Sequence, residues 1–471
     1  MAKILAIDLG TTYFKTALFD RNGRLCDVCR IAPPITVAEA GRMELRADAF
    51  AETVAEGIAT LRDRNGGGLA DVEAVVFSTQ TNSFLLLDEN NQPLTPIILW
   101  PDERALGIEP EVLERCRAAG FPATTGIPQV NRQFMPAKLL WFQKHQPAVW
   151  RQTRRICLMS DYLTWLLTGK YVTEAGAAGL TGLLDIHRCQ WWLEMLARFE
   201  IDQQQLPTVV RAGTDLGPIT PDAAQRFSLP PTCRFVVGCL DQYAGAIGAG
   251  NVAPGMISET TGTVLATVRC ADRFAVELDP AVFQGPAFQA GLYWEMVFGE
   301  VSANYLQWYR EQLPDRPGFE QLTALAAAVE PGAAGLRLRT DVGLTKPEEV
   351  FFGLTPEHTR GDMVRCIMEA VAAALDGQVA ALSGDAKPCE IRCAGGAARS
   401  DLWLQIKADL LGVATAATLC PEPTSLGAAV LAEASLGGRS VEETARAWVC
   451  LNTSHCPSSE MHRQYQALRA K

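Results

Sequence analysis

Residues 3–20 read Lys-Ile-Leu-Ala-Ile-Asp-Leu-Gly-Thr-Thr-Tyr-Phe-Lys-Thr-Ala-Leu-Phe-Asp, and they carry the strongest structural pattern in the chain. An aliphatic run stops at Gly10-Thr11-Thr12 and a second apolar run begins at Tyr13, which predicts a tight β-hairpin. Turn residues follow, and residues 24–31 resume as a third strand. The chain therefore begins with an antiparallel meander whose first turn, just after Asp8, contains a glycine and two hydroxyls.

The same arrangement returns in the second half of the chain. Residues 234–238 predict a short buried strand, and Asp241 follows at the start of a helix of small residues. Residues 256–268 then repeat the order of a strand, a Thr/Gly turn and a strand. We interpret this repeat as an internal duplication that places one nucleotide-binding unit in each half.

Periodicity also predicts the main elements between and after these hairpins. The region 103–230 is richer in helix than the rest, and a late helix over residues 426–434 is expected to have Thr424 or Ser425 as its N-cap. The other expected elements are helices over 47–62 and 361–382 and strands over 72–77 and 389–393.

Length and composition exclude several classes of protein. The 471 residues exceed the roughly 250–300 at which one core usually stops growing, so two domains with a cleft are expected. With 48% hydrophobic and 20% charged residues, the chain is not disordered. A formal charge of −11 without a Lys/Arg block argues against a nucleic acid partner. No apolar run reaches roughly 18 residues and no signal-peptide pattern is present, so we expect a cytoplasmic protein with no membrane partner.

The 14 cysteines are scattered without the spacing of a disulfide framework, which is typical of thiols in a reducing compartment. Cys26 and Cys29 have the spacing of a redox or zinc half-site, but no second pair accompanies them. Alternate placement along a strand explains this pair more simply.

The first turn has the composition of a polyphosphate site. A glycine turn exposes backbone N–H groups to an anion, Thr11 and Thr12 add hydroxyl donors, and Asp8 can hold Mg²⁺ through water. Asp241 is either a helix cap or a carboxylate that takes a proton from a substrate hydroxyl during phosphoryl transfer. Neither a Walker loop nor a dinucleotide-binding Gly-x-Gly-x-x-Gly motif occurs at the other glycine-rich turn, residues 394–397.

Six segments, in their order along nearly the whole chain, resemble the FGGY family of carbohydrate kinases, whose superfamily includes actin, hexokinase and the heat-shock chaperone ATPases. Cys366 departs from the small residue that this family prefers at its position. The similar segments are residues 7–12 with Lys15, 138–142, 238–248, 261–263, 352–354 with Asp362, Met363, Met368 and Glu369, and 394–397 with Ser400, Trp403 and Gln405.

The resemblance implies an α/β protein of two ribonuclease-H-like domains of the actin-like ATPase kind, residues 1–248 and 249–471, hinged near 245–255 around a central cleft. It implies transfer of the ATP γ-phosphoryl group to a sugar, with Asp241 as general base and Asp8 as a catalytic carboxylate that also binds Mg²⁺. The nucleotide-binding residues that it implies are Gly10, Thr11, Thr12, Lys15, Gly262, Thr263, Gly395, Gly396 and Ser400.

The resemblance also implies a sugar site, formed by Gln80, Thr81, Trp100, Asp102 and Gln242. The charged Arg-Glu pair usual in glycerol kinases is absent after Gln80, while Trp100, Asp102 and Arg104 are similar to a xylulose-kinase stretch. A ketopentose such as xylulose is the first expectation, and a polyol such as erythritol or glycerol is the second. A nucleotide-driven switch protein and a relative that binds a sugar without phosphorylating it are the remaining alternatives, and homodimer formation is left open.

Overall fold

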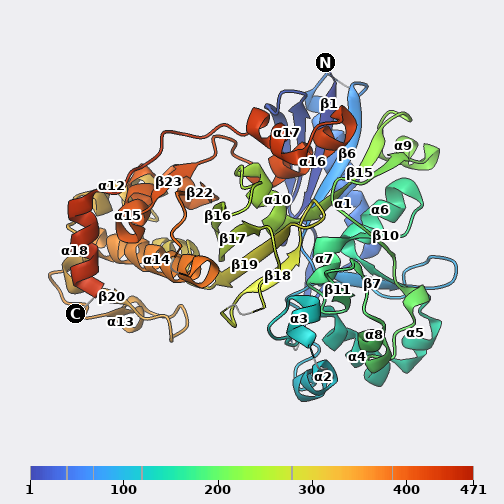
Figure 1. Ribbon diagram of the computed structural model, residues 1–471, viewed down its shortest axis with the longest axis horizontal. Helices are drawn as coiled ribbons and strands as arrows, with labels where there is room; N and C mark the ends of the chain where they lie inside the picture. The colour runs from blue at the N-terminus through green and yellow to red at the C-terminus, as the bar shows by residue number, and fades with distance from the viewer. Residues whose placement is uncertain are drawn as a thin grey trace.

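The computed structural model describes residues 2–38, 41–66, 68–117, 120–276, 279–384 and 386–469. Two lobes each contain a six-stranded mixed sheet (Figure 1). The first sheet has the order β14-β15-β6-β1-β2-β3 and the second the order β18-β19-β17-β16-β22-β23. The first sheet consists of β1 (Lys3–Leu9), β2 (Phe14–Asp20), β3 (Leu25–Ile31), β6 (Val72–Thr79), β14 (Asp215–Pro218) and β15 (Arg234–Leu240). The second consists of β16 (Ile257–Thr261), β17 (Leu265–Ala271), β18 (Phe283–Pro286), β19 (Tyr293–Gly299), β22 (Glu390–Ala394) and β23 (Ala414–Ala417).

Each of these sheets is built around one hairpin. β1 and β2 pair antiparallel from Lys3 opposite Asp20 to Leu9 opposite Phe14, which leaves residues 10–13 as the turn. β16 and β17 pair in the same way up to Thr261 opposite Leu265. In both lobes the first strand of the hairpin has a parallel neighbour on its other side, β6 in one lobe and β22 in the other. The expected repeat of strand, turn and strand is present in both lobes, and the two-domain α/β class is confirmed.

Smaller sheets and short helices complete the first lobe and the edge of the second. The segment between β8 and β15 carries most of the short helices, as its composition predicted. The remaining strands are β4 (Thr36–Ala38), β5 (Arg42–Leu45), β7 (Phe84–Leu87), β8 (Ile97–Ile98) and β9 (Arg155–Leu158), which form one sheet, and the pairs β10 (Val172–Glu174) with β13 (Thr208–Val210), β11 (Leu184–Asp185) with β12 (Gln190–Trp191), and β20 (Arg337–Leu338) with β21 (Phe351–Phe352).

Helices cover the sheets, and several of them position the site described below. The α-helices of the first half are α1 (Ala47–Arg64), α2 (Glu109–Cys116), α3 (Phe121–Thr125), α4 (Met135–His145), α5 (Pro147–Gln152), α6 (Met159–Thr168), α7 (Ala175–Gly179), α8 (Leu193–Arg198), α9 (Pro221–Phe227) and α10 (Asp241–Gly248). Those of the second half are α11 (Asn304–Gln312), α12 (Phe319–Ala327), α13 (Pro347–Val350), α14 (Arg360–Ser383), α15 (Asp401–Leu411), α16 (Pro423–Gly437), α17 (Val441–Trp448) and α18 (Ser459–Arg469). Within the described residues the chain also forms the 3₁₀ turns η2 (Gln203–Gln205), η3 (Ala333–Gly335) and η4 (Gly396–Arg399).

Helix α16 returns from the second half of the sequence to the first lobe. Figure 1 shows it in red beside β1 and β6, and it packs against α10 and, in the first sheet, chiefly against β1, β6 and β15. A Cβ at Gly427 would lie 1.8 Å from the carbonyl oxygen of Ala244, and one at Gly248 would lie 1.8 Å from that of Pro423. The two helices can therefore meet backbone to backbone only because both positions are glycine.

The expected N-cap of α16 was wrong. The helix begins at Pro423, one or two residues before Thr424 and Ser425, and Glu422 precedes it. Proline is favoured in a first helical turn because its fixed φ suits the helix and its missing N–H would have no intrahelical partner there. Glu422 is thereby left at the helix entrance, where it contacts two cations described below.

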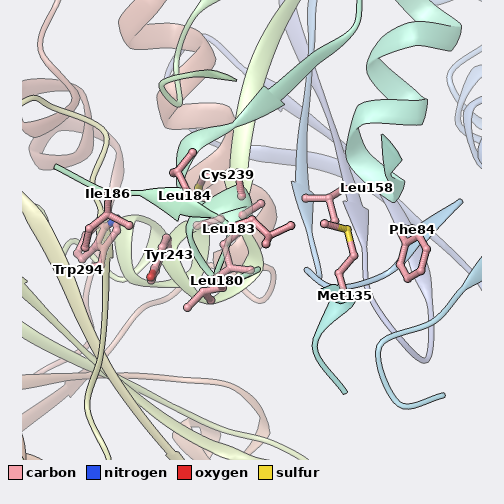
Figure 2. Close-up of a cluster of buried hydrophobic side chains, with 14 of the residues drawn as sticks. Phe84, Met135, Leu158, Leu180, Leu183, Leu184, Ile186, Cys239, Tyr243 and Trp294 are labelled. Carbon is pink, nitrogen blue, oxygen red and sulfur yellow. The ribbon is translucent and has the colours of Figure 1, made fainter. Parts of the chain in front are cut away.

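Buried apolar side chains connect the two lobes. Figure 2 shows part of this cluster, which includes residues of α10 and of β19. Tyr243 on α10 stacks on Trp294 on β19, with ring centroids 5.6 Å apart, and both side chains are buried. The lobes therefore share packed core at the side of the molecule where α10 and α16 cross.

Helix α14 is, by length and composition, apolar enough to cross a membrane, and it is the one such helix in the described ranges. Half of its apolar window is buried inside the protein, and the helix packs against α12, α15, β17 and β19. Arg365 on α14 pairs with Glu369 one turn later, so charged residues interrupt its apolar run. We describe α14 as the central helix of the second lobe.

Candidate active site

Asp8 lies near the end of β1, and two neighbours hold its carboxylate. The Ser78 hydroxyl donates to Oδ1 at 2.8 Å, and Lys15 Nζ lies 3.1 Å from Oδ2. Lys15 is directly opposite Asp8 in the hairpin, so strand pairing itself brings the two charges together. Lys15 also lies 3.2 Å from Glu422, which in turn pairs with Arg30. Burial disfavours the charge on Lys15, but the two carboxylates outweigh burial and raise its pKa.

Asp241 is the first residue of α10, at the carboxyl end of β15. Because β15, β6 and β1 run parallel, Asp241 and Asp8 lie at the same edge of the first sheet. The close approach of β15 to β6 requires Gly238, since a Cβ there would lie 1.5 Å from the carbonyl oxygen of Phe77. Burial raises the pKa of Asp241 to about 7, and the negative charge of Asp8 contributes to the rise. A carboxylate that titrates near neutrality is suited to accept a proton at physiological pH.

Trp100 is fixed by its backbone and by its ring. Its indole N–H donates to the Thr11 hydroxyl at 3.1 Å, which links the predicted sugar site to the first turn. Its backbone N–H donates to Ser83 Oγ at 2.9 Å. The buried Lys138 Nζ donates to the carbonyl oxygens of Trp100 and Leu99 at 2.7 and 2.8 Å, and burial lowers the pKa of Lys138 to about 7.

The other uncharged residues predicted for the sugar site lie in the turn that follows β6 and on α10. The Gln80 side-chain oxygen accepts from Ser83 Oγ at 3.1 Å, and Gln80 is buried. The Thr81 hydroxyl donates to the carbonyl oxygen of Ala177 on α7 at 2.7 Å. Gln242 follows Asp241 on α10, is half-buried, and donates its backbone N–H to the Asp241 carboxylate at 2.7 Å.

Asp102 is fully buried, and its carboxylate is occupied by partners within the protein. Arg104 donates two side-chain bonds, at 2.7 Å to Oδ1 and 2.9 Å to Oδ2, together with its backbone N–H at 3.0 Å. The backbone N–H of Met43 donates to Oδ2 at 2.7 Å. Four donors use all of the acceptor positions of a carboxylate. Arg104 is itself shared with Glu44 at 2.6 Å.

The second lobe contains a cavity of about 1460 Å³ between β16, α11, α12 and the start of α15. Gly262, Thr263, Gly396 and Ser400, all predicted to bind nucleotide, line it. No pattern in the sequence indicates the part of the wall supplied by α11 and α12, because these helices carry no glycine-rich turn. Among the lining residues that were missed are Asn304, Gln307, Phe319, Gln321 and Leu402.

The remaining predicted nucleotide residues lie behind this cavity or in the other lobe. Gly395 has a φ of +85°, and a Cβ there would lie 2.6 Å from the carbonyl oxygen of Thr261, so it allows the two turns of the second lobe to touch. Among the described residues, the cavity wall does not include the turn 10–12 or Lys15, which lie at the edge of the first sheet with Asp8. The predicted residues thus form two groups, one in each lobe.

All 14 cysteines are free. Cys26 is exposed and Cys29 buried on β3, as alternate placement along a strand predicts. Within the part of the chain that the structure describes, no group of three or more His, Cys, Asp or Glu side chains could hold a metal by itself. A magnesium ion that binds through one carboxylate, water and phosphates would not need such a group.

Residues 3–248 match the N-terminal domain of the FGGY family of carbohydrate kinases, and residues 234–436 match its C-terminal domain. The chain belongs to this family. The FGGY chain is 28% identical over 456 residues to the xylulose kinase of Lactococcus lactis, covering 93% of this chain and 88% of that protein. It is 30% identical over 453 residues to the glycerol kinase of Dechloromonas aromatica, covering 92% and 89%. The crystal structure of gluconate kinase from Lactobacillus acidophilus has a TM-score of 0.89 at 24% identity, covering 99% of this chain and 96% of that one.

The FGGY kinase is therefore an ATP-using phosphotransferase that acts on a small sugar or related molecule. Its two-lobed architecture is consistent with the actin and hexokinase superfamily. The relatives are named for three different acceptors, so membership of the family leaves the acceptor open.

Proposed function

We propose that this FGGY kinase transfers the γ-phosphoryl group of ATP to a hydroxyl of an uncharged sugar, a ketopentose such as xylulose, with Asp241 as general base. The observation that carries the proposal is the position of Asp241, at the same sheet edge as Asp8 and with a pKa raised to about 7. Asp241 takes the proton of the acceptor hydroxyl as its oxygen bonds to the γ-phosphorus, and the bond from that phosphorus to ADP breaks.

Asp8 fits the role of the magnesium-side carboxylate. It is a buried oxygen donor beside a turn with backbone N–H groups and hydroxyls, and Mg²⁺ prefers oxygen ligands and retained water. A magnesium ion held there would neutralise phosphate charge as the reaction proceeds. Lys15 adds a fixed cation on the same hairpin, and closure of the two lobes would exclude water as a competing acceptor.

The charges near Trp100 support an uncharged acceptor. Arg104 is shared between Asp102 and Glu44, and Lys138 is used by two backbone carbonyls, so neither cation is available to a substrate carboxylate. Trp100, Gln80, Thr81 and Gln242 supply the ring and neutral hydrogen-bonding groups that a sugar needs. We assign Asp102 to support of the segment that carries Trp100.

A polyol is the second candidate acceptor, and the 30% identity to a glycerol kinase supports this alternative. The same neutral groups would bind a short polyol, although the Arg-Glu pair usual in glycerol kinases is absent after Gln80. We further propose that the kinase acts in the cytoplasm, where its 14 free thiols would remain reduced.

A coupled assay of ADP release with MgATP and a panel of acceptors tests the proposal. The panel contains ketopentoses, aldoses, polyols, glycerol and aldonic acids, each at the same concentration. We expect the highest kcat/KM with a ketopentose and none with an aldonic acid. Preference for an aldonic acid would contradict the neutral site, and ATP binding without turnover on any acceptor would favour a sugar-binding relative without kinase activity.

A further inference from the structure

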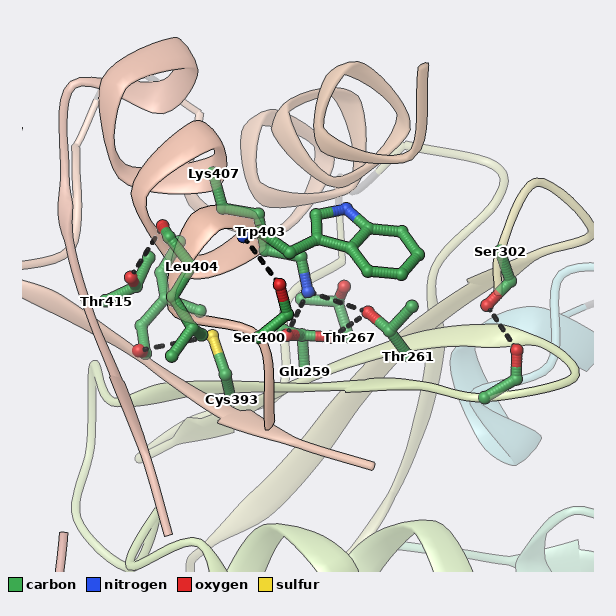
Figure 3. A network of polar contacts seen from close by, with 12 residues as sticks. Glu259, Thr261, Thr267, Ser302, Cys393, Ser400, Trp403, Leu404, Lys407 and Thr415 are labelled. Atoms are coloured by element: carbon green, nitrogen blue, oxygen red, sulfur yellow. Dashed lines mark hydrogen bonds and ion pairs between the residues drawn. The ribbon is translucent and has the colours of Figure 1, made fainter. Parts of the chain in front are cut away.

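A lysine and a glutamate are buried together beneath the turn 262–263 of the second lobe. Lys407 on α15 donates to Glu259 Oε1 on β16 at 2.6 Å, and neither side chain has any exposed surface (Figure 3). The two residues lie 148 positions apart in the sequence. Removing both charges from water is costly, and apolar residues in place of such a pair are often as stable or more stable. The pair therefore calls for an explanation other than stability.

The pair fixes the hydroxyl of Thr261, the residue immediately before the turn. Thr261 donates to Glu259 Oε2 at 2.5 Å and accepts from Lys407 Nζ at 2.8 Å, so its hydroxyl is used both as donor and as acceptor (Figure 3). Beyond it, the carbonyl oxygen of Gly262 accepts from the Ser302 hydroxyl at 2.8 Å. The direction in which the chain enters the turn is thus determined by buried polar contacts.

Lys407 connects the same network to a second part of the cavity wall, the start of α15. It lies on α15, whose N-cap Ser400 accepts a hydrogen bond from the Trp403 N–H at 3.2 Å. Ser400 and Trp403 both line the cavity, as do Thr261, Gly262 and Thr263. Lys407 Nζ lies 5.8 Å from the centre of the Trp403 ring, one turn further along the helix. The Lys407 ammonium group therefore contacts Thr261 directly and lies close to the Trp403 ring, and both of those residues line the cavity.

We infer that Lys407 and Glu259 are positioning residues that hold the turn 262–263 at a fixed distance from the start of α15, so that a nucleotide bound at α15 has its outer phosphates at the turn. Neither residue lines the cavity itself, so their effect passes through Thr261 and through the helix. This inference rests on the proposal that the cavity lined by Gly262, Thr263, Gly396 and Ser400 is the nucleotide site of the kinase. It adds that phosphate recognition at the turn 262–263 depends on a charge pair that does not line the cavity.

The test uses the full chain and the double variant Glu259→Gln/Lys407→Met, which removes both charges at similar volume and leaves no buried charge unpaired. Calorimetric titration compares the affinity for ATP with that for AMP. We expect the ATP affinity to fall roughly tenfold in the variant, and kcat on the best acceptor by up to about 10²-fold, since small displacements of a binding group have large effects. The affinity for AMP and the KM of the acceptor should stay at the wild-type values.

A matched control is the double variant Arg269→Met/Glu295→Gln. This pair joins β17 and β19 of the same sheet at 3.1 Å, with Glu295 buried, but neither residue lines the cavity. The control should keep the wild-type ratio of ATP to AMP affinity. An unchanged ratio in the Glu259/Lys407 variant, or an equal change in the control, would overturn the inference.

Two further comparisons keep the test decisive. If the double variant does not fold, Thr261→Val and Thr261→Ser replace it, because serine retains the hydroxyl and valine retains only the shape. Loss of the ATP preference in the valine variant alone supports the inference, and equal behaviour of the two overturns it. Failure of the wild-type chain to bind ATP would instead refute the proposed nucleotide site, so the two failures are distinguishable.

Discussion

The two lobes present the same hairpin in opposite electrostatic settings. In the first, Asp8 pairs with Lys15 across the hairpin itself, and the lysine side chain is 27% exposed. In the second, Glu259 pairs with Lys407 from a helix, and both side chains are 0% exposed. Both carboxylates lie on the first strand of the hairpin, shortly before its Gly/Thr turn. Solvent therefore reaches the Asp8–Lys15 pair through the lysine, whereas the Glu259–Lys407 pair is fully buried.

This difference in exposure suits the two charge pairs to different roles, ligand binding in the first lobe and positioning of neighbouring residues in the second. A pair that remains partly solvated can exchange its partner for a metal or a phosphate without leaving a buried charge unpaired. A sealed pair cannot exchange partners and serves to fix its neighbours in place. Asp241, with its raised pKa, lies in the lobe with the open pair, and the large cavity lies in the lobe with the sealed one.

The largest expected effect comes from Asp241→Asn, which breaks the chemistry of the open lobe. Asparagine cannot accept the proton of the acceptor, and a general base contributes about 10²–10⁴-fold to the rate. We expect kcat to fall by that factor in a steady-state assay, while ATP affinity and the thermal midpoint are retained. Turnover near the wild-type rate would show that another group takes the proton.

The second prediction compares how much stability the protein loses when either charge pair is broken. Glu259→Gln leaves Lys407 buried without a counter-charge, so we expect a loss of about 3–5 kcal/mol in the free energy of unfolding. Asp8→Asn leaves Lys15 partly solvated and still beside Glu422, so its loss should be below about 1 kcal/mol. Urea denaturation of both variants measures the difference. Equal losses would mean that the two settings do not differ in the way described.

A smaller effect concerns the contact between α10 and α16. Gly427→Ala introduces a Cβ that would lie 1.8 Å from the carbonyl oxygen of Ala244, so the helices must separate. We expect a loss of about 1–3 kcal/mol, as for other overpacked contacts, measured by thermal or urea unfolding. Gly377→Ala on α14 is the control, because its Cβ would meet open space and should not destabilise the protein. A tolerated Gly427→Ala would show that the crossing can loosen freely.

Much of the fold could be predicted because local patterns specify it. The Gly/Thr turn after Asp8 and its repeat before Val264 mark two hairpins, and strand pairing follows from their spacing. Gly262 and Gly396 belong to such turns, and both line the cavity of the second lobe. A turn of this kind depends on a few adjacent residues, so it can be recognised in a single sequence.

The rest could not be predicted because it depends on contacts between distant segments. Lys407 pairs with Glu259 and Glu422 pairs with Lys15 only in the folded chain. Nothing in the residues adjacent to Lys407 or Glu422 indicates those partners. The N-cap of α16 was wrong because Thr424 and Ser425 are good caps locally, whereas Pro423 is favoured in the first helical turn and the helix begins there. The sequence likewise does not reveal that Arg104 donates two side-chain hydrogen bonds to the Asp102 carboxylate.

The pH dependence of kcat/KM tests the central claim, that Asp241 with a raised pKa takes the acceptor proton. The rate is measured at low nucleotide and acceptor concentrations, where it reports the free enzyme. Because the base must be deprotonated, and burial raises its pKa to about 7, we predict that kcat/KM rises with pH and levels off above about 7. A rate that stays constant through this range, in protein that remains folded, would contradict the account.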